Sequence, residues 1–117
     1  MEDSGLTKED IDRIRTVFAN YKPVEKALLY GSRAIGNYKP ASDIDIALVG
    51  NSIDLSLQTR IAFDLDDLLL PYKFDISVYG RITNAALIAH INRVGKELYR
   101  CSDYEQNAHK NSVIFHK

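Results

Sequence analysis

The sequence predicts one small α/β domain in which helices flank a mixed β-sheet. Helical and strand patterns alternate along the 117 residues, and 45% hydrophobic against 26% charged residues is an ordinary globular balance. The length is typical of a single domain. We therefore expect one domain over residues 1–117, with its core over about 7–100 and a C-terminal tail over 101–117.

Three helices are expected where apolar residues recur with helical spacing. Thr7 and Asp54 can cap the first two helices, and either Thr83 or Asn84 can cap the third. Pro71 stops the second helix. The predicted ranges are 7–20, 54–70 and 83–100.

Three strands are expected at 24–30, 43–49 and 73–79, and the segment that ends at Ser42 is predicted to be a loop with room for one helical turn. The connection between the first two strands is short, which favours an antiparallel pair. The helix over 54–70 is long enough for a crossover, which favours parallel pairing of the second and third strands. This topology brings Gly31, Asp43 and Asp75 to one end of the sheet.

Asp43 and Asp45 lie two residues apart on a predicted strand, so both carboxylates project to the same face. Asp75, near the start of the third strand, is expected beside them. Carboxylate oxygens are the ligands that Mg²⁺ prefers, and three neighbouring acids would repel one another strongly without cations. Asp10-x-Asp12 and Asp64-x-Asp66 share the spacing but lie on predicted helices, where the carboxylates diverge, and are interpreted as solvated faces.

Gly31-Ser32-Arg33 follows a buried strand and can approach an anion. Glycine lets the backbone come close, the Ser32 hydroxyl and backbone N–H groups can donate hydrogen bonds to phosphate oxygens, and Arg33 adds a charged fork. A plain Gly-Ser turn is the alternative interpretation. The phosphate-loop patterns of P-loop enzymes and of dinucleotide-binding folds do not occur in the sequence.

The charge balance argues against nucleic acid or an anionic membrane as a partner, because 15 Lys and Arg residues face 16 Asp and Glu residues, a net charge of −1. The lone Cys101 cannot form an internal disulfide, the sequence has no apolar run of membrane-spanning length, and residues 1–5 do not resemble a signal peptide. A cytoplasmic location is expected. The three histidines, including His90, show no metal-ligand spacing with Cys101 and are interpreted as surface or satisfied side chains.

The strings LYGSRAIG over 29–36 and SDIDIAL over 42–48 resemble the Gly-Ser, ten residues, Asp-x-Asp signature of the DNA polymerase beta nucleotidyltransferase superfamily. Ten residues separate Ser32 from Asp43, as in that signature, and Asp75 stands where the family has a third carboxylate. The length resembles the minimal nucleotidyltransferases (MNT) that accompany helical HEPN proteins. The resemblance implies the polymerase beta-like nucleotidyltransferase fold. It covers about residues 24–80.

The resemblance implies that Gly31 and Ser32 bind the triphosphate of ATP, the substrate, with Arg33 nearby. Asp43, Asp45 and Asp75 would hold two Mg²⁺ ions and form the catalytic site, and Asp75 would help to deprotonate the attacking hydroxyl.

The sequence departs from the family pattern at Ile35, where many members have a second arginine. Phosphate binding could therefore be weaker than in those members.

The partner that the resemblance implies is a HEPN ribonuclease toxin, which an MNT antitoxin neutralises by transferring AMP to a tyrosine. Two alternatives stay open at this point: a binding-only antitoxin, and a small-molecule nucleotidyltransferase that works with a separate substrate-binding subunit. A homodimer is a further expectation. An apolar contact surface is expected from the last helix and residues 113–115.

Overall fold

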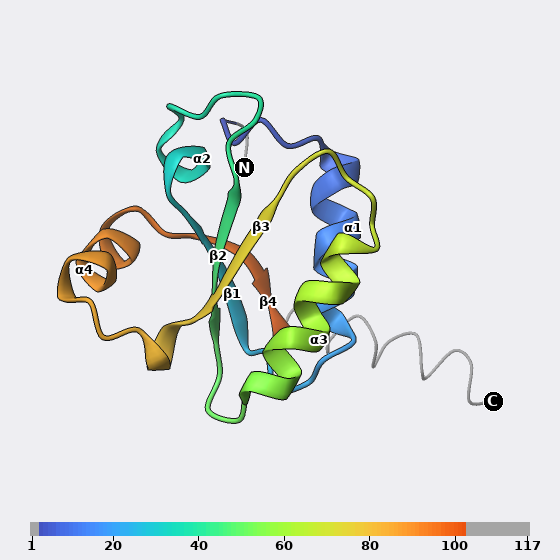
Figure 1. Cartoon of the computed structure of the whole chain (residues 1–117), viewed down its shortest axis with the longest axis vertical. Helices are drawn as coiled ribbons and strands as arrows, with labels where there is room; N and C mark the ends of the chain where they lie inside the picture. The colour runs from blue at the N-terminus through green and yellow to red at the C-terminus, as the bar shows by residue number, and fades with distance from the viewer. Residues whose placement is uncertain (1–2, 103–117) are drawn as a thin grey trace.

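A four-stranded sheet in the order β3-β2-β1-β4 is the centre of the computed structural model, which describes residues 3–102 (Figure 1). The strands are β1 (Lys26–Tyr30), β2 (Ile44–Val49), β3 (Phe74–Val78) and β4 (Lys96–Arg100). β1 pairs antiparallel with β2, and β2 pairs parallel with β3, as the sequence predicted. The mixed sheet confirms the predicted fold class.

The helices cover the two faces of the sheet unequally (Figure 1). α1 (Lys8–Ala19) and α3 (Leu55–Asp66) pack on one face, and α4 (Ala85–Val94) lies on the other. A single helical turn, α2 (Ser32–Ile35), follows β1 directly, which confirms the turn expected in that loop, and the 3₁₀ turn η1 (Tyr79–Arg81) follows β3.

Side-chain caps begin the three longer helices where the sequence predicted them. Thr7 accepts a hydrogen bond from the backbone N–H of Asp10, whose carboxylate in turn accepts from the N–H of Thr7, and the two bonds form a capping box. Asp54 caps α3, and Asn84 rather than Thr83 caps α4.

The main core lies between the sheet and the pair α1 and α3. Ile44 and Ile46 of β2 are fully buried in it. Because side chains alternate along a strand, Asp45 and Ala47 point to the opposite face, where only a small cluster of Tyr30, Ala47 and Ile91 is buried under α4. The lightly covered face is therefore the one that carries the polar side chains of the predicted site.

The prediction of a single helix over 83–100 is wrong. α4 ends at Val94, Gly95 adopts an extended backbone, and Lys96–Arg100 forms β4 along the outer edge of β1. Leu98 continues the i, i+4 apolar spacing of α4 but is fully buried from the strand. Pairing with β1 gives a free sheet edge hydrogen-bond partners, and this gain prevails over the local helical pattern.

Other boundaries are shorter than predicted: α3 ends at Asp66 instead of near residue 70, and β1 begins at Lys26 instead of residue 24. Most of the predicted tail, residues 103–117 with the apolar residues 113–115, lies outside the described residues. None of the helices within residues 3–102 has both the length and the apolar character needed to cross a bilayer.

Candidate functional site

Two aspartates face each other across the parallel pair β2 and β3. Asp45 and Asp75 are direct partners in the register of these strands, and on the other side of β2 Tyr30 is the partner of Asp45. Asp43 precedes the first residue of β2, two residues from Asp45. The three sequence-predicted carboxylates therefore lie at one end of the sheet.

The carboxylates differ in exposure and influence one another. Asp43 and Asp75 are exposed, whereas Asp45 is half-buried between them. Burial, together with the negative charges of Asp75 and Asp43, raises the pKa of Asp45 from 3.8 to about 6. Burial also raises the pKa of Tyr30, and the negative charges of Asp75 and Asp45 raise it further. This end of the sheet is thus a region of concentrated negative charge.

Gly31 contacts the most buried of these carboxylates. Its backbone has φ of +73°, a conformation that residues with a side chain rarely adopt. A Cβ added at this position would overlap Oδ2 of Asp45. A glycine is therefore required here for two independent reasons, and the turn after β1 lies directly against the carboxylates.

His90 of α4 holds the same turn from the helical side. Its Nε2 accepts a hydrogen bond from the backbone N–H of Gly31 at 3.1 Å, and its ring is nearly perpendicular to that of Tyr30, with the centroids 6.1 Å apart. Accepting at Nε2 assigns the proton of the neutral ring to Nδ1. The interpretation of His90 as a satisfied side chain agrees with this bond, but its place beside the site was missed, since no sequence pattern links residue 90 to residue 31.

Ser32 and Arg33 occupy different environments although they are adjacent. Ser32 is the first residue of α2 and is partly exposed. Arg33 is 1% exposed, and its guanidinium donates hydrogen bonds to the carbonyl oxygens of Ser4, Pro40 and Ser42. The donors of Arg33 thus point to the protein's own backbone, and its expected contact with a nucleotide stays a prediction.

Three carboxylates are a donor set that fits Mg²⁺, and their mutual repulsion favours a bound cation. Within residues 3–102, however, no three His, Cys, Asp or Glu side chains are grouped closely enough to hold a metal ion. Donor chemistry and charge therefore fit the ion, and the carboxylates would have to converge further to bind it.

Three of the four carboxylates in the other Asp-x-Asp pairs have structural partners. Asp10 closes the capping box of α1, and Asp64 accepts a hydrogen bond from the hydroxyl of Tyr21. Asp12 pairs with Lys8 at 3.2 Å on the exposed face of α1. Both pairs lie on helices, as predicted.

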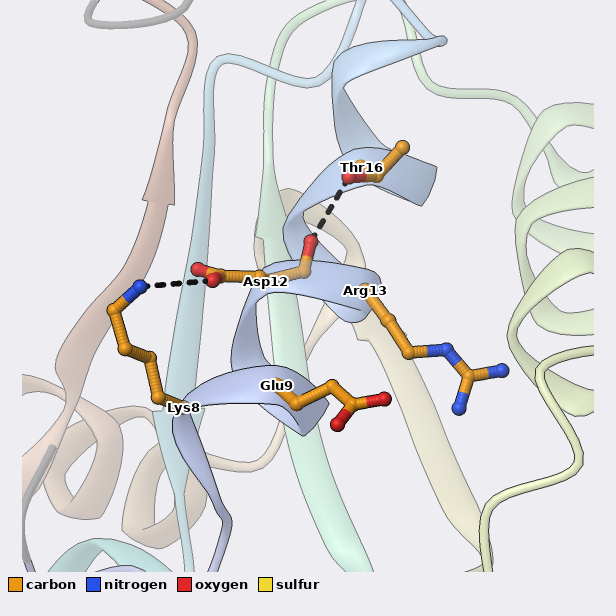
Figure 2. Close-up of a pocket in the computed structure, with 5 residues that line it drawn as sticks. All are labelled: Lys8, Glu9, Asp12, Arg13 and Thr16. Carbon is orange, nitrogen blue, oxygen red and sulfur yellow. Dashed lines mark hydrogen bonds and ion pairs between the residues drawn. The ribbon is translucent and has the colours of Figure 1, made fainter.

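Figure 2 shows a hollow over this face of α1, in which the Asp12–Lys8 pair lies beside Thr16, whose hydroxyl donates to the backbone oxygen of Asp12. None of the sequence-predicted site residues lines this hollow. It is a solvated helix surface apart from the candidate site.

Comparison with known families identifies the fold. A sequence model of the family described as "Polymerase beta, Nucleotidyltransferase" matches residues 12–104, most of the chain. A search of curated protein sequences found no significant match.

Solved structures with a similar fold come from toxin–antitoxin complexes. One is a crystal structure of a toxin–antitoxin complex with AMP-PNP, to a chain of which this protein is 23% identical, with a TM-score of 0.63. The alignment covers 95% of this protein and 88% of that chain. This protein is 17% identical to a chain of the structure of a tri-AMPylated HEPN toxin from Shewanella oneidensis in complex with an MNT antitoxin, with a TM-score of 0.62 and coverage of 95% and 87%. A chain of the MntA–HepT toxin–antitoxin structure is also 17% identical, with a TM-score of 0.61 and coverage of 94% and 86%.

Proposed function

Since the chain belongs to the polymerase beta nucleotidyltransferase family, we propose that it is an Mg²⁺-dependent antitoxin that transfers AMP from ATP to a tyrosine of a HEPN ribonuclease toxin in the cytoplasm. The observation that carries this proposal is the pairing of Asp45 with Asp75, with Gly31 directly against Asp45. This arrangement joins a phosphate-binding turn to a set of carboxylates. The transfer would neutralise the toxin.

The similar structures support the choice of nucleotide and acceptor. One holds AMP-PNP, an analogue of ATP, and another contains a HEPN toxin that carries three AMP groups beside its MNT antitoxin. The chain covers most of the length of each of these antitoxin-like chains.

In the proposed reaction a tyrosine oxygen attacks the α-phosphorus of ATP. A phosphorus–oxygen bond to the tyrosine forms, the bond between the α-phosphorus and the bridging oxygen breaks, and pyrophosphate leaves. The hydroxyl and the backbone N–H of Ser32 bind the triphosphate, and Gly31, which has no side chain, lets the phosphates come close to the backbone. Asp75, exposed at the open end of the sheet, accepts the phenolic proton, which with a pKa near 10 is easier to remove than that of serine.

Asp43, Asp45 and Asp75 are the residues that would hold two Mg²⁺ ions. When bound, these ions would stabilise the charges of the attacking and leaving oxygens. The raised pKa of Asp45 is consistent with this role, because a carboxylate that is hard to ionise alone is stabilised as the anion by a cation.

The test is co-expression with a HEPN toxin, followed by incubation of the complex with Mg²⁺ and ATP and mass spectrometry of the toxin. One or more added AMP masses, lost in Asp43→Asn and retained in the exposed Asp66→Asn control, are expected. Neutralisation without any added mass under every nucleoside triphosphate identifies a binding-only antitoxin instead. Transfer to a small alcohol or an antibiotic, but not to the toxin, keeps the chemistry and refutes the proposed acceptor.

A further inference from the structure

Arg33 is the one charged side chain that is buried within residues 3–102, where it is 1% exposed. A buried guanidinium costs free energy unless its donors and charge are satisfied. Its burial in a domain of this size therefore calls for a structural or functional reason.

Three carbonyl oxygens accept hydrogen bonds from the guanidinium. Nη1 donates to Ser4 at 2.9 Å, Nη2 donates to Pro40 at 3.3 Å and to Ser42 at 3.0 Å, and Nε donates to Ser42 at 3.2 Å. Every nitrogen of the guanidinium is thus engaged with backbone. Binding a phosphate would require these bonds to break and the side chain to leave its buried position.

Two aromatic rings stabilise the charge. The guanidinium carbon lies 4.6 Å from the ring centroid of Tyr72 and 5.0 Å from that of Tyr38, within the range of cation–π attraction. The planar fork of arginine can stack on rings while it donates in its own plane, and a lysine ammonium cannot do both.

The partners of Arg33 lie next to the predicted site residues in sequence. Arg33 directly follows Ser32, Ser42 directly precedes Asp43, and Tyr72 comes three residues before Asp75. One side chain therefore joins the phosphate-binding turn to the two segments that enter the carboxylate-bearing strands β2 and β3.

The geometry points to Arg33 as a positioning residue, which sets the placement of the triphosphate-binding turn relative to Asp43 and Asp75 and does not itself contact the nucleotide. This inference rests on the proposed nucleotidyl transfer, and it assigns Arg33 a role different from the phosphate contact that the Gly31-Ser32-Arg33 sequence predicts. Because small errors in the placement of reacting groups can cost about 10²-fold in rate, loss of this link affects turnover more than binding.

The first test compares Arg33→Lys with Arg15→Lys, using the toxin complex as acceptor. Arg15 is a matched control because its Nε also donates to a backbone carbonyl, that of Leu98 at 2.6 Å, on the far side of the sheet from the site. For Arg33→Lys we expect kcat to fall at least tenfold while KM for Mg²⁺-ATP changes less than threefold, and for Arg15→Lys we expect both to stay near the wild-type values. A tenfold rise in KM with kcat retained indicates direct phosphate contact and overturns the inference, as do unchanged values of both.

The second test needs no activity. The backbone N–H of Ser42 donates a hydrogen bond to the carbonyl oxygen of Lys39, and the backbone N–H of Ile44 donates one to the carbonyl oxygen of Lys73. In Arg33→Lys without nucleotide, amide hydrogen exchange should become at least tenfold faster at residues 42 and 44 but not in β4. Unchanged exchange at these two amides overturns the inference, whether or not the wild type transfers AMP. If the wild type transfers no AMP but Arg33→Lys shows the expected faster exchange, only the proposed function is refuted.

A milder pair of variants covers the case in which Arg33→Lys does not fold. Tyr72→Phe keeps the ring that stacks on the guanidinium and should retain wild-type kcat, whereas Tyr72→Leu removes it and should lower kcat and speed exchange at residues 42 and 44. If Tyr72→Phe and Tyr72→Leu have the same kcat and the same exchange rates at residues 42 and 44, the role assigned to the buried guanidinium is contradicted.

Discussion

Replacing Asp45 by asparagine should stabilise the protein in the absence of metal, although it removes a proposed metal ligand. In the folded protein burial and, to a smaller extent, the charges of Asp75 and Asp43 raise the pKa of Asp45 to about 6, whereas in the unfolded chain the value is 3.8. At pH 7.5 the carboxylate is charged in both states, and its charge is unfavourable only in the folded one. Asparagine has almost the same shape and no charge.

The expected size of the effect follows from the pKa difference. A shift from 3.8 to about 6 corresponds to about 3 kcal/mol at full strength. Because the side chain is only half-buried, solvent screening reduces the expected gain to about 1 kcal/mol. For a domain of this size that is an increase in Tm of about 4 °C.

The dependence on pH gives the prediction its direction. A folded-state pKa above the unfolded value means that the contribution of Asp45 to stability is fully present below pH 3.8 and is lost as the pH rises through about 6. The advantage of Asp45→Asn over the wild type should therefore be largest above pH 6 and should vanish near pH 4.

The assay is urea or thermal unfolding in the presence of a chelator at pH 7.5 and at pH 4. Asp66→Asn, which neutralises an exposed carboxylate at the end of α3, is the control and should change stability by only a few tenths of a kcal/mol. An Asp45→Asn protein that is less stable than the wild type at pH 7.5, or whose advantage is the same at both pH values, would refute the reasoning.

Two further predictions concern the nucleotide site. Mg²⁺ with ATP at 100 times Kd should stabilise the wild type by about 2.7 kcal/mol, and ATP with a chelator should do so far less; equal thermal shifts under the two conditions would count against a metal-dependent site. Gly31→Ala should lower the free energy of unfolding by about 1–3 kcal/mol and abolish AMP transfer, because the new Cβ meets Asp45 and φ is +73°. Gly80→Ala is the control and should be tolerated, because the space around its Cβ position is open. Unfolding curves measure the stability of both variants, and mass spectra of the toxin measure the transfer.

Much of the candidate site could be predicted because its signals are short patterns. Asp43 and Asp45 share a strand face through the two-residue repeat of a β-strand, and the lengths of the connections predicted that Gly31 and Asp75 would lie beside them. The pairing of the strands confirms this arrangement. The roles of these residues in binding and catalysis stay predictions.

The neighbours of His90 and Arg33 could not be predicted from the same patterns. His90 meets Gly31 only because α4 folds back over β1, 59 residues along the chain. Arg33 lies in a segment whose sequence is compatible with an exposed phosphate-binding turn, and its direction depends on Ser4, Tyr38 and Tyr72 closing around it. Burial of this kind has no local signal.

The sequence by itself determined the caps of α1 and α3, the shared strand face of Asp43 and Asp45, and the Gly-Ser and Asp-x-Asp elements of the site, because each depends on residues within a turn or a strand of one another. Only the tertiary structure decided that Lys96–Arg100 is a strand, that Arg33 points inward, and that the pKa of Asp45 is raised to about 6. The physical reason is that the strand that pairs with a sheet edge, the rings and carbonyls that enclose a guanidinium, and the burial and the Asp75 charge that act on Asp45 depend on segments distant in sequence.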